Sequence, residues 1–65
     1  MSAYTITYLD EQNEKITSEA VFMRSLRAAK SSGTARAPYM TSSITIANVV
    51  GKLLATKEGG KWVDH

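Results

Sequence analysis

The chain has 65 residues, a formal net charge of +2, no cysteine and a single histidine, His65. A chain of this length forms one domain, residues 1–65, and 43% apolar with 22% charged residues is the composition of a globular protein. The cysteine and histidine counts exclude a disulfide framework, a thiolate zinc site and a histidine-based catalytic triad. We therefore expect no metal and no cofactor.

The sequence shows no feature of a membrane or secreted protein. No run of 18 apolar residues occurs, so we expect no membrane-spanning segment and no membrane partner. Residues 1–5 lack the basic and apolar regions of a signal peptide. We expect the protein to work in the cytoplasm.

Residues 3–9 show the alternation of a β-strand. The face with the larger side chains consists of Tyr4, Ile6 and Tyr8. The polar residues 10–14 that follow include aspartate and asparagine, which favour turns. Residues 15–17 can return as a short second strand, so the N-terminal region predicts a hairpin.

Two amphipathic helices are expected after this hairpin. In residues 18–32, apolar side chains recur at spacings of three and four, and Ser18 can cap the first turn. Residues 43–57 show the same spacing and follow other residues suited to an N-cap. We expect the two helices to enclose a core. Its members are Phe22, Leu26, Ile46, Val50 and Leu53.

The C-terminal residues allow two interpretations. Gly59 and Gly60 can end the second helix, after which residues 61–63 form a short closing strand. Residues 57–62 can instead form a tight hairpin. The expected element order is β-(β)-α-α-β. The sequence thus predicts an α+β fold, in which a small antiparallel sheet, made of the N-terminal strand or hairpin and the short C-terminal strand, packs on two helices.

Acidic residues are absent between Glu19 and Glu58. The stretch between them carries six basic residues: Arg24, Arg27, Lys30, Arg36, Lys52 and Lys57. Such a separation of charge produces a positive face, which attracts phosphate groups. Lysine and arginine also favour any solvent-exposed surface, so the pattern is compatible with plain solvation as well.

We interpret this stretch as a nucleic-acid-binding surface. In the expected second helix, Thr45, Asn48 and Lys52 lie on one face, and these residue types contact base edges and phosphates. The candidate binding residues are Arg24, Arg27, Arg36, Thr45, Asn48 and Lys52. The expected function is that of a small DNA-binding regulator, which docks a basic helical face onto nucleic acid or onto an acidic protein surface.

A second interpretation is an inhibitor or adaptor that acts on a larger protein through an edge strand and aromatic anchors. The candidate interface residues are Tyr4, Tyr8, Tyr39 and Trp62, because aromatic residues are enriched at interfaces. A chain this short has a small core. We therefore also expect self-association into a homo-oligomer, with a homodimer as the simplest case.

Catalysis is not expected. Acid–base and nucleophilic chemistry needs a positioned base and a partner group. The carboxylates Asp10, Glu11 and Glu14 gather in an expected turn without a group to orient them, and no glycine-rich phosphate-binding loop is present. We expect a binding protein that has no catalytic residues.

Overall fold

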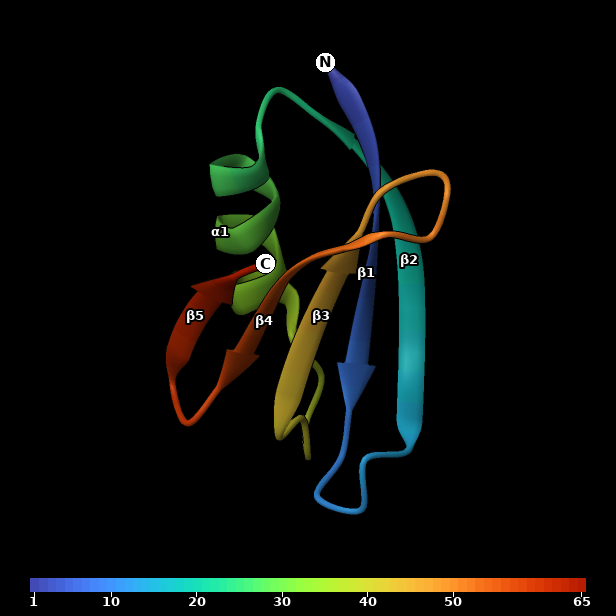
Figure 1. The fold of residues 1–65 in the computed structure, drawn as a ribbon. Helices are drawn as coiled ribbons and strands as arrows, with labels where there is room; N and C mark the ends of the chain where they lie inside the picture. Colours follow the sequence, from blue (N-terminus) through green and yellow to red (C-terminus); the bar gives the residue numbers. More distant parts are fainter.

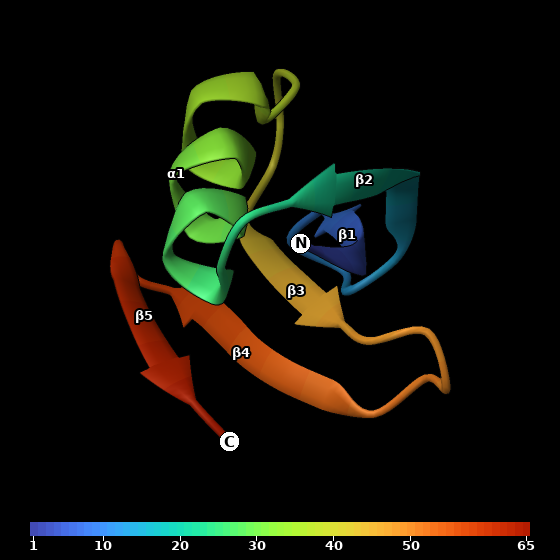
Figure 2. The ribbon, with the colours of Figure 1, turned by 90° about the horizontal axis from the view of Figure 1, so that it is seen from above.

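Five antiparallel strands and a single helix make up the fold (Figure 1). The computed structural model describes residues 1–65, and the strand order across the sheet is β2-β1-β3-β4-β5. The elements are β1 (Ser2–Leu9), β2 (Lys15–Met23), α1 (Leu26–Arg36), β3 (Ser43–Ala47), β4 (Leu53–Glu58) and β5 (Lys61–Asp64). Helix α1 covers one face of the sheet, and no element covers the opposite face (Figure 2). No helix has the length and apolar character needed to cross a membrane.

The core lies between α1 and the central strands β1 and β3. The alternation expected in β1 is present, because Tyr4, Ile6 and Tyr8 are all buried. Ile44 and Ile46 of β3 are also buried, and they lie opposite Tyr8 and Ile6 in the antiparallel register. The two central strands therefore supply most of the buried apolar side chains.

Helix α1 approaches the sheet closely because its buried side carries small residues. Ala29 is fully buried, and Gly33 packs over the sheet. A Cβ atom at Gly33 would lie 3.4 Å from Cγ2 of Ile6 and 3.6 Å from Cγ2 of Ile44. The helix backbone at Gly33 therefore lies directly against Ile6 and Ile44. This packing offsets the cost of glycine in a helix interior, which is about 1 kcal/mol relative to alanine.

The expected helix over residues 18–32 is wrong in its first part. Residues 18–23 belong to β2, which pairs antiparallel with the whole of β1. The helix begins only at Leu26, where the Ser25 hydroxyl accepts a hydrogen bond of 3.2 Å from the backbone N–H of Ala28. The helical spacing of apolar residues thus runs across two different elements. Pairing with β1 decides the outcome, because it satisfies the backbone groups along the inner side of β2.

The expected second helix, residues 43–57, is a β-hairpin made of β3 and β4. Asn48 organises its turn, since Oδ1 accepts hydrogen bonds from the backbone N–H groups of Val50 at 3.1 Å and Lys52 at 2.9 Å. Gly51 completes the turn with a φ of 85°. Isoleucine and threonine in β3 favour a strand, and β1 and β4 pair with it on both sides. The expected packing of a small sheet on two helices is therefore wrong.

Residues 57–62 form a tight hairpin, which confirms the second of the two interpretations of this segment. Strands β4 and β5 pair through a turn at Gly59 and Gly60, whose φ values are 58° and 79°. Two adjacent residues with positive φ suit the twist of a tight hairpin. The two glycines therefore connect strands and do not end a helix.

The core expected between two helices is also wrong. Ile46 is fully buried, but it lies on β3. Leu26 packs at the edge of the core. Phe22 is 65% exposed, Val50 is 83% exposed and Leu53 is 40% exposed. Because the predicted helical faces do not exist, their apolar residues are divided between the two faces of the sheet and a turn.

Candidate nucleic-acid interface

We call the segment between Glu19 and Glu58, which contains no acidic residue, the acid-free stretch. Two of its basic residues pair with acidic residues that lie outside it. Arg36 makes a bidentate contact with Glu19, with Nε 3.2 Å from Oε1 and Nη2 3.1 Å from Oε2. Lys30 forms an ion pair with Asp64. The acid-free stretch of the sequence is therefore not an acid-free surface, and Arg36 has a structural partner.

Arg36 belongs to a network that joins α1 to the two N-terminal strands. Tyr8 of β1 donates a hydrogen bond of 2.9 Å to Oε1 of Glu19 in β2. Burial and the neighbouring carboxylate raise the pKa of Tyr8 to about 12. The hydrogen bonds from Arg36 and Tyr8 hold the pKa of Glu19 below its usual value, and Glu19 raises the pKa of Arg36. These shifts stabilise the fold and identify no ligand.

Three other basic residues lie at one end of the molecule. The β2–α1 connection, the start of α1 and the β3–β4 turn all lie at the end where β1 begins (Figure 1). This end, which we call the basic end, carries Arg24, Arg27 and Lys52. Neither ion pair of the structure includes any of them. The opposite end holds the acidic β1–β2 turn, so charge is polarised along the strands.

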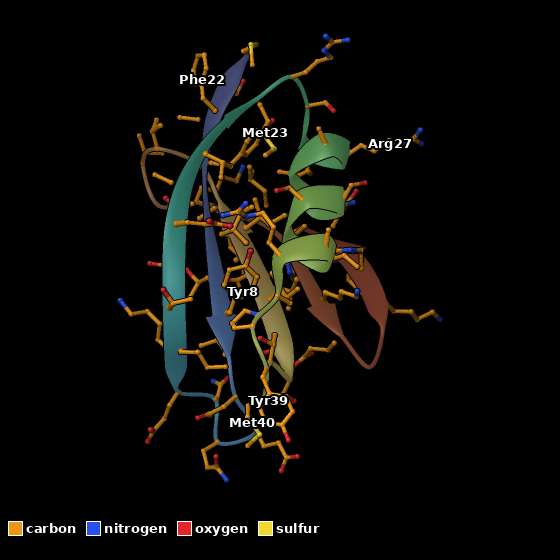
Figure 3. All side chains as sticks on the ribbon, turned by 180° about the vertical axis from the view of Figure 1, so that it is seen from behind. Tyr8, Phe22, Met23, Arg27, Tyr39 and Met40 are labelled. Carbon is orange, nitrogen blue, oxygen red and sulfur yellow. The ribbon has the colours of Figure 1, made fainter.

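A groove runs between α1 and β5 and begins at Arg27. Its volume is about 430 Å³. Its lining residues are Arg27, Lys30, Ser31, Thr34, Ala35 and Trp62. Figure 3 shows that the Arg27 side chain points away from the sheet at the start of α1. The groove therefore shares a cation with the basic end.

Trp62 is the aromatic centre of this groove. The ammonium group of Lys30 lies 6.0 Å from the centroid of the Trp62 ring. The indole Nε1 donates to Oγ1 of Thr34 at 3.4 Å, and the ammonium group of Lys57 donates to the same oxygen at 3.1 Å. Trp62 thus lines the groove together with two cations, Arg27 and Lys30, and Lys30 is paired with the carboxylate of Asp64. A third cation, Lys57, contacts the groove residue Thr34.

This arrangement suits a polyanion that also carries flat rings. Lysine and arginine neutralise phosphates and release their counterions. An indole ring provides a surface on which a nucleobase stacks, and such stacking contributes about 1–3 kcal/mol per base. The hydroxyl groups of Ser31 and Thr34 add hydrogen-bonding groups beside these cations. The groove therefore has the chemical elements of a site for a nucleic acid strand.

The structure brings together some of the residues predicted to bind nucleic acid and separates others. Arg24, Arg27 and Lys52 share the basic end, and Asn48 lies there too, although its side chain is engaged in the β3–β4 turn. Thr45 lies on the uncovered face of the sheet, opposite Thr7 and Thr56. Thr45, Asn48 and Lys52 do not share a helix face, so the predicted base-reading helix is wrong.

The predicted aromatic anchors also separate. Tyr4 and Tyr8 are buried in the core and offer no surface for a partner. Trp62 is half-buried in the groove. Tyr39 is 91% exposed in the connector between α1 and β3, beside a second pocket of about 400 Å³ (Figure 3). Of the four, Trp62 and Tyr39 are accessible.

Sequence reasoning did not select Lys30, Thr34 or Lys57 as site residues. Lys57 and Thr34 are separated by 23 residues, and Trp62 and Thr34 by 28. No local spacing links residues so far apart in the sequence. The sequence indicates only that Lys30 and Lys57 belong to the acid-free stretch. Because the same is true of every other basic residue there, this does not identify them as site residues.

No group of three or more histidine, aspartate and glutamate side chains is placed to hold a metal ion. The candidate site consists of the groove and the basic end.

Comparison of the chain with models of known families, with curated proteins and with solved structures found no match.

Proposed function

We propose that this protein binds single-stranded nucleic acid in the groove between α1 and β5. In this proposal a base stacks on Trp62, and Arg27, Lys30 and Lys57 contact the phosphates on either side. Arg24 and Lys52 of the basic end attract the rest of the strand. The observation that carries the proposal is the position of the single tryptophan in a groove lined by Arg27 and Lys30, with Lys57 joined to the groove through its hydrogen bond to Thr34.

A single strand is favoured over a duplex for a geometric reason. Sequence-specific readers of B-DNA insert a helix or a two-stranded ribbon into the major groove. In this protein the cations on α1 line a groove beside β5. An unpaired base can enter such a groove and stack, whereas a base within a duplex cannot. We place the protein in the cytoplasm, acting as a non-enzymatic regulator, as part of the same proposal.

Trp62 provides a direct test, because it is the only tryptophan. We expect single-stranded oligothymidylate and a single-stranded RNA of equal length to quench its fluorescence. A duplex of the same length should quench it much less. Because phosphate binding releases counterions, the affinity should fall steeply between low and moderate salt. Unchanged fluorescence with both single strands would refute the proposal.

Variants locate the site. Trp62→Leu should weaken binding about tenfold, measured by fluorescence anisotropy of a labelled oligonucleotide, because it removes the stacking surface. Lys57→Gln should weaken binding at low salt. Lys15→Gln is the matched control, since Lys15 lies at the start of β2, at the end remote from Arg27. Equal effects of Lys57→Gln and Lys15→Gln would mean that net charge, not the groove, controls binding.

A second candidate function is binding to a larger protein, and two exposed features favour it. Strand β2 is a nine-residue edge strand whose outer backbone groups lack a neighbouring strand. Such an edge can accept a strand from a partner. Tyr39 and Met40 are exposed beside each other, and Met40 has a φ of 77°. Binding of this kind would persist at high salt and would be lost in Tyr39→Ala.

A further inference from the structure

The uncovered side of the sheet has a regular composition. We call it the open face, and the strand register arranges its residues in rows. One row is Ala20, Thr5, Ala47 and Leu53, from β2 to β4. The next row is Ser18, Thr7, Thr45, Thr56 and Val63, from β2 to β5. Neither of these two rows contains a charged residue, and their positions in the middle of the sheet carry small side chains. The third row, beside the β1–β2 turn, contains three charged residues and consists of Lys15, Leu9, Ser43, Glu58 and Lys61.

Larger apolar residues lie at the margins of the two uncharged rows. Phe22 lies opposite Ala3 at the end of β2, while Leu53 and Val63 end the two rows on the other side. All three of these larger residues are exposed. The open face therefore presents small side chains between exposed apolar margins. At one margin the His65 ring contacts Thr56, with Nε2 2.9 Å from Oγ1.

The β3–β4 turn projects on the same side. Figures 1 and 2 show that this turn lies on the side of β1 and β2 that faces away from α1. Val49 and Val50 are 77% and 83% exposed in this turn. The contacts of Asn48 with the turn backbone hold it in shape. One surface thus presents both a projecting apolar turn and an area of small side chains.

We propose that the open face is the interface of a two-fold symmetric homodimer. A two-fold interface requires a self-complementary surface, in which a projection of each copy meets a recess of the other. Here the small residues of the two uncharged rows would face each other, and the Val49–Val50 turn of each copy would lie against the far end of its neighbour's open face. The proposal is independent of nucleic acid binding, because the groove lies on the helix side of the sheet.

The charge distribution selects one of the possible two-fold arrangements. Lys52 lies in the projecting turn, and Glu11 and Glu14 lie in the β1–β2 turn at the opposite end of the strands. If each strand of one copy runs in the same direction as the corresponding strand of the other copy, the two basic ends meet and repel. If they run in opposite directions, each Lys52 approaches the acidic turn of the other copy. The proposed dimer therefore has antiparallel strands.

The size of the face sets the expected affinity. Five strands about 4.8 Å apart, each paired over roughly five residues of about 3.3 Å, give a footprint of about 24 by 17 Å. This footprint of about 400 Å² per copy is roughly half of the area that a standard interface buries on each partner. We therefore expect a weak dimer that shows a concentration-dependent monomer–dimer equilibrium in sedimentation velocity.

Substitution at the centre of the face tests its location. Thr45→Lys and Val50→Asp should each shift the protein to monomer, because each places a charge in the interface. Ala35→Lys is the control, since Ala35 is exposed on α1, on the other side of the sheet. A native chain that stays monomeric at several hundred micromolar would overturn the proposal. So would a Val50→Asp variant that dimerises as tightly as the native chain, which would point to the edge of β2 instead.

Cross-linking gives a second, independent test. The chain has no cysteine, so a single introduced cysteine reports only on its own position. Thr45→Cys should form a disulfide-linked dimer on mild oxidation much faster than Ala35→Cys, because Thr45 lies in a central row near the proposed symmetry axis. Equal rates for the two variants would contradict the proposed interface.

A charge exchange tests the direction of the strands. The variant Lys52→Glu and the double variant Glu11→Lys/Glu14→Lys should each dimerise more weakly than the native chain, because like charges meet in both. Mixing these two variants should restore dimers, since each turn then meets an opposite charge in the other chain. If the mixture forms no more dimer than the variants form separately, the antiparallel arrangement is wrong.

Discussion

The phenol of Tyr8 donates a hydrogen bond of 2.9 Å to the carboxylate of Glu19, and this contact joins the centre of the core to the edge strand β2. Arg36 binds the same carboxylate from the last turn of α1. One side chain of an edge strand therefore connects β1, β2 and the helix. Removing any of the three groups should affect the stability of the fold more than the binding surface.

Tyr8→Phe should lower the free energy of unfolding by about 1 kcal/mol, the usual contribution of one hydrogen bond. Phenylalanine fills the same space, and Glu19 keeps its contact with Arg36, so no buried polar group loses its last partner. Urea denaturation measures the change. Tyr4→Phe is the matched control, because the structure contains no hydrogen bond from the Tyr4 hydroxyl to another side chain, and we expect it to be nearly neutral.

The stability should fall in acid because of Glu19. The pKa of Glu19 in the folded protein lies below its usual 4.5, chiefly because of Arg36. A carboxyl group with a lower pKa in the folded state contributes stability that is present above the unfolded value and is lost as pH falls through the folded value. The melting temperature should therefore decrease below about pH 4.5. Glu19→Gln should remove much of this decrease, and an unchanged acid profile would contradict the assignment.

Tyr8 should produce the opposite dependence in alkali. Its pKa is raised to about 12 by burial and by Glu19. A group whose folded pKa is raised contributes stability that is present below its unfolded pKa and is lost as pH rises toward the folded value. Between the ordinary tyrosine pKa of about 10 and this value the protein should lose stability. Ultraviolet titration should show a late ionisation step near the pKa of Tyr8, and that step should be absent in Tyr8→Phe.

Gly33→Ala should leave the stability unchanged or raise it by up to about 1 kcal/mol, because alanine favours a helix interior. The added Cβ would meet Ile6 and Ile44 at 3.4 and 3.6 Å, which are ordinary contact distances. Gly33→Val should instead cost about 1–3 kcal/mol through overpacking. Thermal denaturation distinguishes the two variants, and a similar loss in both would show that the helix lies closer to the sheet than described.

Ile46→Ala should cost about 2–5 kcal/mol, because its side chain is fully buried between β1 and α1. A domain of this size has a net stability of only about 3–5 kcal/mol, so this variant should be largely unfolded at room temperature. Val50→Ala is the control in dilute solution, where the protein is monomeric, since Val50 is exposed in a turn of the isolated chain and its truncation should change the stability of the fold little. Circular dichroism of both variants makes the comparison.

The elements predicted correctly are those whose signals are local. The alternation of Tyr4, Ile6 and Tyr8 identifies β1 without any knowledge of its neighbours. The polar residues 10–14 identify the first turn, where the Asp10 carboxylate accepts hydrogen bonds from the backbone of Gln12 and Glu14. The paired glycines at residues 59–60 favour a hairpin because both adopt positive φ.

The candidate site follows from the sequence only in part. The acid-free stretch contains Arg24, Arg27 and Lys52, and the antiparallel topology gathers these three residues at one end. The pairing of Arg36 with Glu19 spans 17 residues, and that of Lys30 with Asp64 spans 34. Such pairs depend on where the chain returns in space, and no spacing in the sequence encodes them.

By itself the sequence determined the first strand, the turns and the kinds of side chain available for binding. The tertiary structure decided that residues 18–23, 43–47 and 53–57 form strands, although the apolar spacing over 18–32 and 43–57 also fits helices. A helix satisfies its backbone within four residues, so its pattern is local. A strand depends on hydrogen bonds to neighbours elsewhere in the chain. Here β1 provides them on both sides, pairing with β2 and β3, and this pairing outweighed the local helical pattern.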